Sequence, residues 1–253
     1  MPEYGDLVQP LLNAFEESGS PAVLLSPRSQ RHPRQFVIQI GSEVVEIWVY
    51  IWTLTHGGGA KRPVNEYRIQ LTGIRQPPLQ ENPTGGPTLL LGYEPNLNCF
   101  AGFDLRKHQV FSTKSPSIQI SLTALQAAVQ DGFAFAPKGN NEIAVGFRPD
   151  QLLAYALNAN LLHDQGVDPK TIALLSRVAG DQIVSAEAMN EISAERQRIV
   201  SKVARLSRDA RFRRSVINAY NHTCAVTGIQ LRLVEAAHIL PVGAVASTDQ
   251  TTN

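Results

Sequence analysis

The sequence has few cysteines, no long apolar run and no excess of charge of either sign. Its two cysteines, Cys99 and Cys224, are far apart among 253 residues, which argues against a disulfide framework and fits a reducing compartment. No apolar run approaches the roughly 18 residues of a membrane span. No basic region followed by an apolar core marks a secretory signal near Met1. We therefore expect a cytoplasmic protein with no membrane partner.

Charge is distributed unevenly, although the formal net charge is only +1. Eight basic residues and one acid, Asp209, lie between Arg196 and Arg214, whereas the rest of the chain has 15 basic and 21 acidic residues. A mildly acidic body joined to a strongly basic segment is typical of a protein that binds nucleic acid through that segment. The alternative is an ordinary helix with a charged, solvated face.

The first 165 residues show both strand and helix patterns. Residues 36–40 and 44–52 are rich in β-branched and aromatic side chains, and Gly41-Ser42 between them predicts a hairpin. Ser121 and Gly132 are expected to begin and end a helix. The patterns predict an α+β domain around an antiparallel or mixed sheet. Further strands are expected at 66–72, 88–93, 98–104, 117–120, 133–135 and 142–147, and further helices at 6–18 and 149–162.

The pattern becomes helical after the Gly166–Pro169 stretch, which predicts a boundary. Helices are expected at about 170–178 and 185–206. The sequence therefore predicts three parts: an α+β domain over 1–165, a basic helical linker over 166–207, and a further module over 208–253.

The basic helix is expected to carry cations on one face. Arg198, Lys202 and Arg205 are four and three positions apart, so they share a face, whereas Ile199 and Val203 share another that would pack inward. Each Lys or Arg that neutralises a phosphate releases counterions and adds affinity without reading sequence. The run therefore favours double-stranded DNA as a partner. The DNA-binding candidates are Arg198, Lys202, Arg205, Arg208, Arg211, Arg213 and Arg214.

The last fifty residues contain a series of uncommon residues in a recognisable order. They are Phe212-Arg213, Val216, Ala219-Tyr220, Cys224-Ala-Val-Thr-Gly228, Glu235-Ala-Ala-His-Ile239 and Pro241. This order resembles the front half of the HNH nuclease domain over roughly residues 205–253. The resemblance implies a partial ββα module that clamps one divalent metal ion, such as Mg²⁺.

The resemblance also implies roles for individual residues. His238 would be the general base that activates water, since a neutral imidazole can accept a proton near pH 7. Asn253, 15 positions later, would fix the loop that aims this histidine. Ala237 stands where many members have a metal-binding Asp, and Glu235 is the candidate substitute. The family's final metal-binding His does not occur before Asn253, so we expect the chain to be part of a longer protein.

Two features have a structural interpretation as well as a functional one. Cys224 could suggest a zinc site, but Thr227 stands at the position where a paired cysteine would be, so we expect Cys224 to pack as a small apolar residue. Trp48, Tyr50 and Trp52 alternate on one strand and share a face. Ordinary sheet core is the favoured interpretation, and a platform for a base is the alternative.

The leading domain resembles the domain that precedes HNH modules in restriction enzymes. The residues that carry this resemblance are 66–70, 91–93, 100–104 and 115–119. It implies a target-recognition domain joined to a nuclease. We therefore expect a restriction-like HNH DNA endonuclease that depends on a divalent cation, with a homodimer as its candidate assembly. The alternatives are a non-catalytic DNA-binding or defence-regulatory protein, and a leading domain that senses a small ligand.

Overall fold

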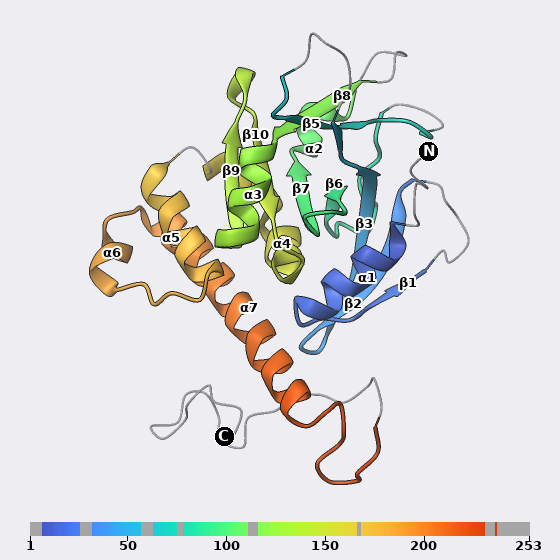
Figure 1. Cartoon of the computed structure of the whole chain (residues 1–253), viewed down its shortest axis with the longest axis vertical. Helices are drawn as coiled ribbons and strands as arrows, with labels where there is room; N and C mark the ends of the chain where they lie inside the picture. The colour runs from blue at the N-terminus through green and yellow to red at the C-terminus, as the bar shows by residue number, and fades with distance from the viewer. Residues whose placement is uncertain are drawn as a thin grey trace.

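The computed structural model has the α+β fold that the sequence predicts (Figure 1). It describes residues 7–25, 32–56, 63–74, 78–110, 116–165, 168–230 and 236. None of the helices in these ranges is both long and apolar enough to cross a bilayer.

A seven-stranded sheet forms the centre of the molecule. Neighbouring strands are antiparallel except for β3 and β6, which run parallel with Ile51 opposite Leu91. The predicted hairpin at Gly41-Ser42 is confirmed by the antiparallel β2–β3 pair, and the strands expected at 133–135 and 142–147 form a second antiparallel pair, β9–β10. The strand order is β1 (Ala22–Leu24), β2 (Arg34–Ile40), β3 (Glu43–Thr53), β6 (Thr88–Glu94), β7 (Cys99–Phe103), β10 (Ile143–Phe147) and β9 (Phe133–Pro137).

One face of this sheet is covered by a small sheet and a helix. The small sheet consists of β4 (Thr55–His56), β5 (Glu66–Gln70) and β8 (Ser117–Ser121), and helix α3 spans Leu122–Asp131. Tyr50 and Trp52 are buried beneath them with Ile69 and Leu125. These two aromatic side chains are therefore sheet core, as the favoured interpretation predicts. The caps of α3 are also as predicted, since Ser121 Oγ accepts from the Ala124 amide at 3.2 Å and Gly132 has a φ of 85°.

The opposite face is covered by four helices. They are α1 (Val8–Glu17), α4 (Leu152–Gln165), α5 (Pro169–Ala179) and α7 (Ala194–Ala219); the short elements α2 (Leu105–His108), α6 (Ala186–Asn190), η1 (Gly139–Asn141) and η2 (Pro149–Gln151) complete the fold. Leu175 and Val203 join the same apolar cluster as Phe36 and Leu91 of the sheet. The segment predicted as a linker is thus packed on the sheet and shares its core.

The long helix differs from the expected one at both ends. Ser193 Oγ accepts from the Arg196 amide at 3.5 Å and starts α7 there, so the expected helix at 185–206 is divided into α6 and α7. At the other end α7 continues to Ala219. The Ser193 side chain takes an amide hydrogen bond that a continuing helix would give to a backbone carbonyl, which explains the break.

A close approach between β7 and α4 holds the centre of the fold together. A side chain on Gly102 would overlap the ring and hydroxyl of Tyr155. The Tyr155 hydroxyl lies 3.0 Å from His163 Nε2, and His163 Nδ1 lies 2.8 Å from the Ile143 carbonyl oxygen. Because that carbonyl can only accept, His163 donates from Nδ1 and accepts from Tyr155 at Nε2.

We predict that Gly102→Ala lowers the free energy of unfolding by about 1–3 kcal/mol, because the added methyl group forces Tyr155 out of its position. Urea denaturation measures this loss. Gly139→Ala is the matched control, since a side chain there meets no atom within 4 Å, and its effect should stay within about 0.5 kcal/mol. Equal stabilities of the two variants would contradict the argument.

We also predict that the protein loses stability as the pH falls below about 6.5, the pKa of an unperturbed histidine. Burial lowers the pKa of His163, and burial lowers that of His32 to about 4. In this range the unfolded chain binds more protons than the folded one, so protonation favours unfolding. Urea denaturation at a series of pH values tests this, and His163→Gln should reduce the slope. A slope unchanged in the variant would exclude His163 as a source.

Candidate nucleic-acid interface

Helix α7 is fixed to the body along one side. Ile199, Val200 and Val203 are buried in the core shared with α4 and α5. One turn further, the buried Ser207 hydroxyl donates to Gln151 Oε1 at 2.7 Å. Because the buried side is set by these contacts, the side of the helix that faces solvent is also set.

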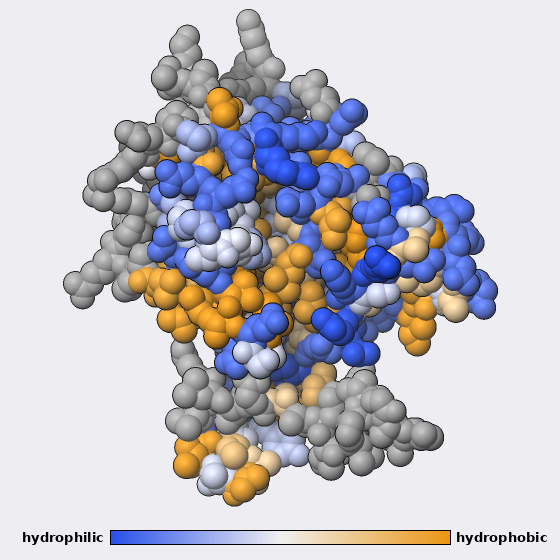
Figure 2. Space-filling view, turned by 180° about the vertical axis from the view of Figure 1, so that it is seen from behind, coloured by the Kyte–Doolittle hydropathy of each residue, from blue (hydrophilic) through white to orange (hydrophobic). Residues whose placement is uncertain are grey.

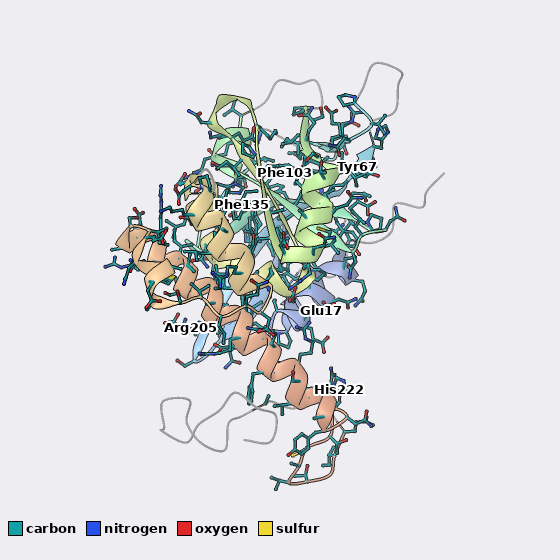
Figure 3. The ribbon with its side chains drawn as sticks, turned by 60° about the vertical axis from the view of Figure 1, so that its left-hand side comes forward. Glu17, Tyr67, Phe103, Phe135, Arg205 and His222 are labelled. Atoms are coloured by element: carbon teal, nitrogen blue, oxygen red, sulfur yellow. The ribbon has the colours of Figure 1, made fainter. Side chains whose placement is uncertain are left out.

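Three of the predicted DNA-binding residues share that solvent-facing side. Arg198, Lys202 and Arg205 are exposed, whereas Ile199 and Val203 point inward. The predicted separation of a basic and an apolar face is therefore confirmed, and Figure 3 shows Arg205 on the outer part of the helix. Binding of DNA by this face stays a prediction.

Three of the other predicted cations lie close to carboxylates. Arg211 pairs with Asp181, and Arg214 Nη2 lies 3.8 Å from Asp150 Oδ2. Arg208 lies 3.4 Å from its neighbour Asp209, and Arg213 is half-buried. The carboxylates beside Arg208, Arg211 and Arg214 reduce what these three arginines can contribute to phosphate binding. The sequence predicted one basic set, and the structure divides it into an open face and a partly compensated one.

A carboxylate pair lies where the second half of α7 approaches α1. Burial raises the pKa of Glu17, and the neighbouring Asp150 raises it further. Arg148 Nε lies 3.0 Å from Asp150 Oδ1, and Arg148 also donates to the Ala179 carbonyl at 2.9 Å. Arg148 and Arg214 thus balance two acids beneath the helix, an arrangement that no sequence motif indicates.

A groove of about 1190 Å³ runs between α7 and the α5–α6 connection. Arg205, Arg208 and Arg211 line one wall, and Met189 and Phe212 contribute apolar surface. Ile183 in the connection is 90% exposed. The sequence gives no signal for this groove, because it depends on where the chain returns after α5.

A tight turn follows α7. The Gly228 amide donates to the Cys224 carbonyl and the Cys224 amide donates to the Ile229 carbonyl, both at 2.9 Å. Gly228 has a φ of 67°, and Thr223 and Gln230 form a β-bridge. A side-chain hydrogen bond with Thr227 lowers the pKa of Cys224, which is half-buried. Thr227 is therefore a partner of Cys224. His222 is exposed at the start of the turn (Figure 3).

The residues predicted for chemistry lie outside the described part of the chain. They are His238, Asn253 and Glu235. Within the described ranges no group of three or more His, Cys, Asp or Glu side chains is arranged to hold a metal ion. The predicted nuclease roles therefore stay predictions.

The sheet domain is similar to a known family. A family model described as methylase-associated X1 matches residues 45–156. This range runs from β3 into α4 and excludes α7 and the Cys224 turn. The match gives the sheet domain a resemblance to proteins associated with restriction–modification systems. No curated protein and no solved structure matches the chain significantly.

We predict that replacing Arg198 and Arg205 by Gln weakens binding to double-stranded DNA and makes it less sensitive to salt. Each lost phosphate contact should lower the slope of log K against log salt by about 0.9, so the double variant should lose about 1.8. Fluorescence anisotropy with a duplex at several salt concentrations measures both effects.

The double change to Lys is the matched control, because it keeps both charges. It should keep most of the affinity and the original slope. Equal binding by the Gln and Lys variants would show that this face does not contact DNA.

Proposed function

We propose that this protein is a restriction-like DNA endonuclease of the HNH type. It would act on double-stranded DNA in the cytoplasm, with the sheet domain choosing the target and the C-terminal module cutting the phosphodiester. A pair of copies would cut both strands. The observation that carries the proposal is the continuity of α7, which bears the exposed basic face at Arg198, Lys202 and Arg205 and runs unbroken to Ala219, shortly before the Cys224 turn of the HNH-like segment.

This continuity supports the proposal for a geometric reason. A helix that holds the phosphate backbone along Arg198, Lys202 and Arg205 brings whatever follows Ala219 to the same duplex. Positioning of a scissile phosphate and a catalytic base is a large part of any rate enhancement. The resemblance of the sheet domain to a methylase-associated family gives the restriction setting independent support.

In the proposed mechanism His238 accepts a proton from the attacking water, and Asn253 keeps the histidine loop in its orientation. A divalent cation such as Mg²⁺ would stabilise the charge that develops on the phosphate and on the leaving oxygen. Carboxylate oxygens suit such a hard ion, and Glu235 is the carboxylate that the segment offers. The cations of α7 would bind the substrate without taking part in proton transfer.

A second function is favoured by one observation. Ala237 stands where many HNH proteins have a metal-binding Asp. If Glu235 does not replace that ligand, the protein would bind DNA without cutting it and would serve in defence as a regulatory module. Cleavage and binding are therefore best measured together.

We predict that His238→Ala, made in the natural full-length protein, lowers Mg²⁺-dependent cleavage of plasmid DNA about 10²–10⁴-fold, because it removes the general base. DNA affinity should not change, since phosphate binding depends on α7. Gel assays of cleavage beside anisotropy measurements separate the two effects.

His222→Ala is the matched control, because it removes an exposed histidine of the same segment that has no assigned role. It should cut normally. Undiminished cleavage by His238→Ala would refute the nuclease assignment of His238. Binding without cleavage by the unmodified protein would favour the regulatory alternative.

A further inference from the structure

The groove beside α7 follows one side of that helix for about four turns. Val200, Ala204, Arg208, Arg211 and Ser215 line it and are three or four positions apart, so they share one side of the helix. At the rise of an α-helix, the wall that they form is about 22 Å long. The α5–α6 connection forms the opposite wall. The groove is therefore long enough to hold about four turns of a second helix.

Apolar side chains form much of the surface between the two walls. Val178 of α5 and Phe212 of α7 line the groove and are 6% and 8% exposed, so they belong to its floor. Met189 of α6 lies beside them, and methionine is common where a protein binds the apolar side chains of a partner. Ile183, on the opposite wall, is 90% exposed. The groove therefore suits an occupant that presents a row of apolar side chains.

The charge around this apolar surface is positive. Four arginines line the groove, Arg205, Arg208, Arg211 and Arg214, against a single acid, Asp181. Asp181 pairs with Arg211, so the excess of positive charge lies along α7. Carboxylates of an occupant would form charge-assisted hydrogen bonds with these guanidinium groups.

An apolar floor beside a cationic wall favours a peptide over a nucleic acid in this groove. A duplex presents hydrated phosphates, which gain nothing from contact with Met189 or Ile183. An amphipathic helix presents apolar side chains every three or four positions and can carry carboxylates beside them. Its apolar row matches the floor, and its carboxylates match the arginines of α7.

We propose that this groove binds an acidic amphipathic helix of a partner protein, and that this helix and DNA exclude each other. Arg205 lies both on the exposed basic face of α7 and in the wall of the groove. A carboxylate paired with Arg205 takes a cation that the duplex would use, and the bound helix adds negative charge to the same side of the molecule. The inference rests on the proposed function and deepens it, because it gives the basic face of α7 a means of regulation.

The probe is a synthetic helical peptide of about 16 residues, with leucine every three or four positions and glutamate on both sides of the leucine row. Fluorescence anisotropy of the labelled peptide with the full chain should show saturable binding. A peptide of the same composition in scrambled order has no apolar face and should bind at least about tenfold more weakly. Equal binding of the two peptides would overturn the proposal, because attraction between charges alone would then explain it.

Ile183→Gln tests the groove itself. It should weaken peptide binding about tenfold, because binding would no longer bury an isoleucine side chain. The fold should not change, since that side chain is exposed in the free protein. Val44→Gln is the matched control, because Val44 is 72% exposed on β3, outside the groove, and this variant should bind the peptide normally. Equal peptide affinities of the two variants would overturn the proposal.

Competition is measured by adding the unlabelled peptide to a labelled duplex. At a peptide concentration about ten times its own Kd, mutually exclusive binding should raise the apparent Kd of the duplex about elevenfold. An unchanged Kd would overturn the exclusion. Peptide binding is measured without DNA, so the two proposals fail separately. Peptide binding by a protein that neither binds nor cuts DNA would reject the proposed function alone, and DNA binding without peptide binding would reject the groove alone.

Discussion

The burial of one side of α7 against the sheet domain is the constraint on which the rest of the arrangement depends. Val203 lies in the same apolar cluster as the central strands. Just beyond the buried apolar residues, the Ser207–Gln151 hydrogen bond fixes the rotation of the helix about its axis. Burial of apolar side chains supplies the free energy that holds the helix on the sheet domain, and the hydrogen bond selects which side of the helix faces inward. With that side fixed, Arg198 and Arg205 have to face solvent, and Arg211 and Arg214 have to face acids of the body.

Local signals in the sequence predict most of the elements. Ser121 and Gly132 mark the ends of α3 because capping and left-handed backbone are properties of single residues. The hairpin at Gly41-Ser42 and the two-sided pattern of α7 follow from equally local rules. By contrast, the parallel pairing of β3 with β6 and the contact between Arg211 and Asp181 join distant parts of the chain. Such contacts depend on the path of the whole backbone.

The candidate site likewise has some features that the sequence predicts and others that it does not. The basic face of α7 could be predicted, because the spacing of its residues is a short local pattern. The groove beside α7 could not, because it depends on where the chain returns after α5. The roles of His238 and Asn253 rest on resemblance, and the described residues do not test them.

The unbroken length of α7 also sets an angular relation between the sheet domain and the Cys224 turn. Its 26 residues span about 39 Å as a single rod. Each residue of a helix turns its successor by about 100°, so one residue added beyond Phe212 would rotate the Cys224 turn away from its present side. Four added residues would nearly restore the angle and move the turn about 6 Å outward. The length of the helix therefore fixes both the distance and the orientation of the Cys224 turn relative to the sheet domain. Substitutions along the helix should be tolerated more easily than insertions or deletions within it.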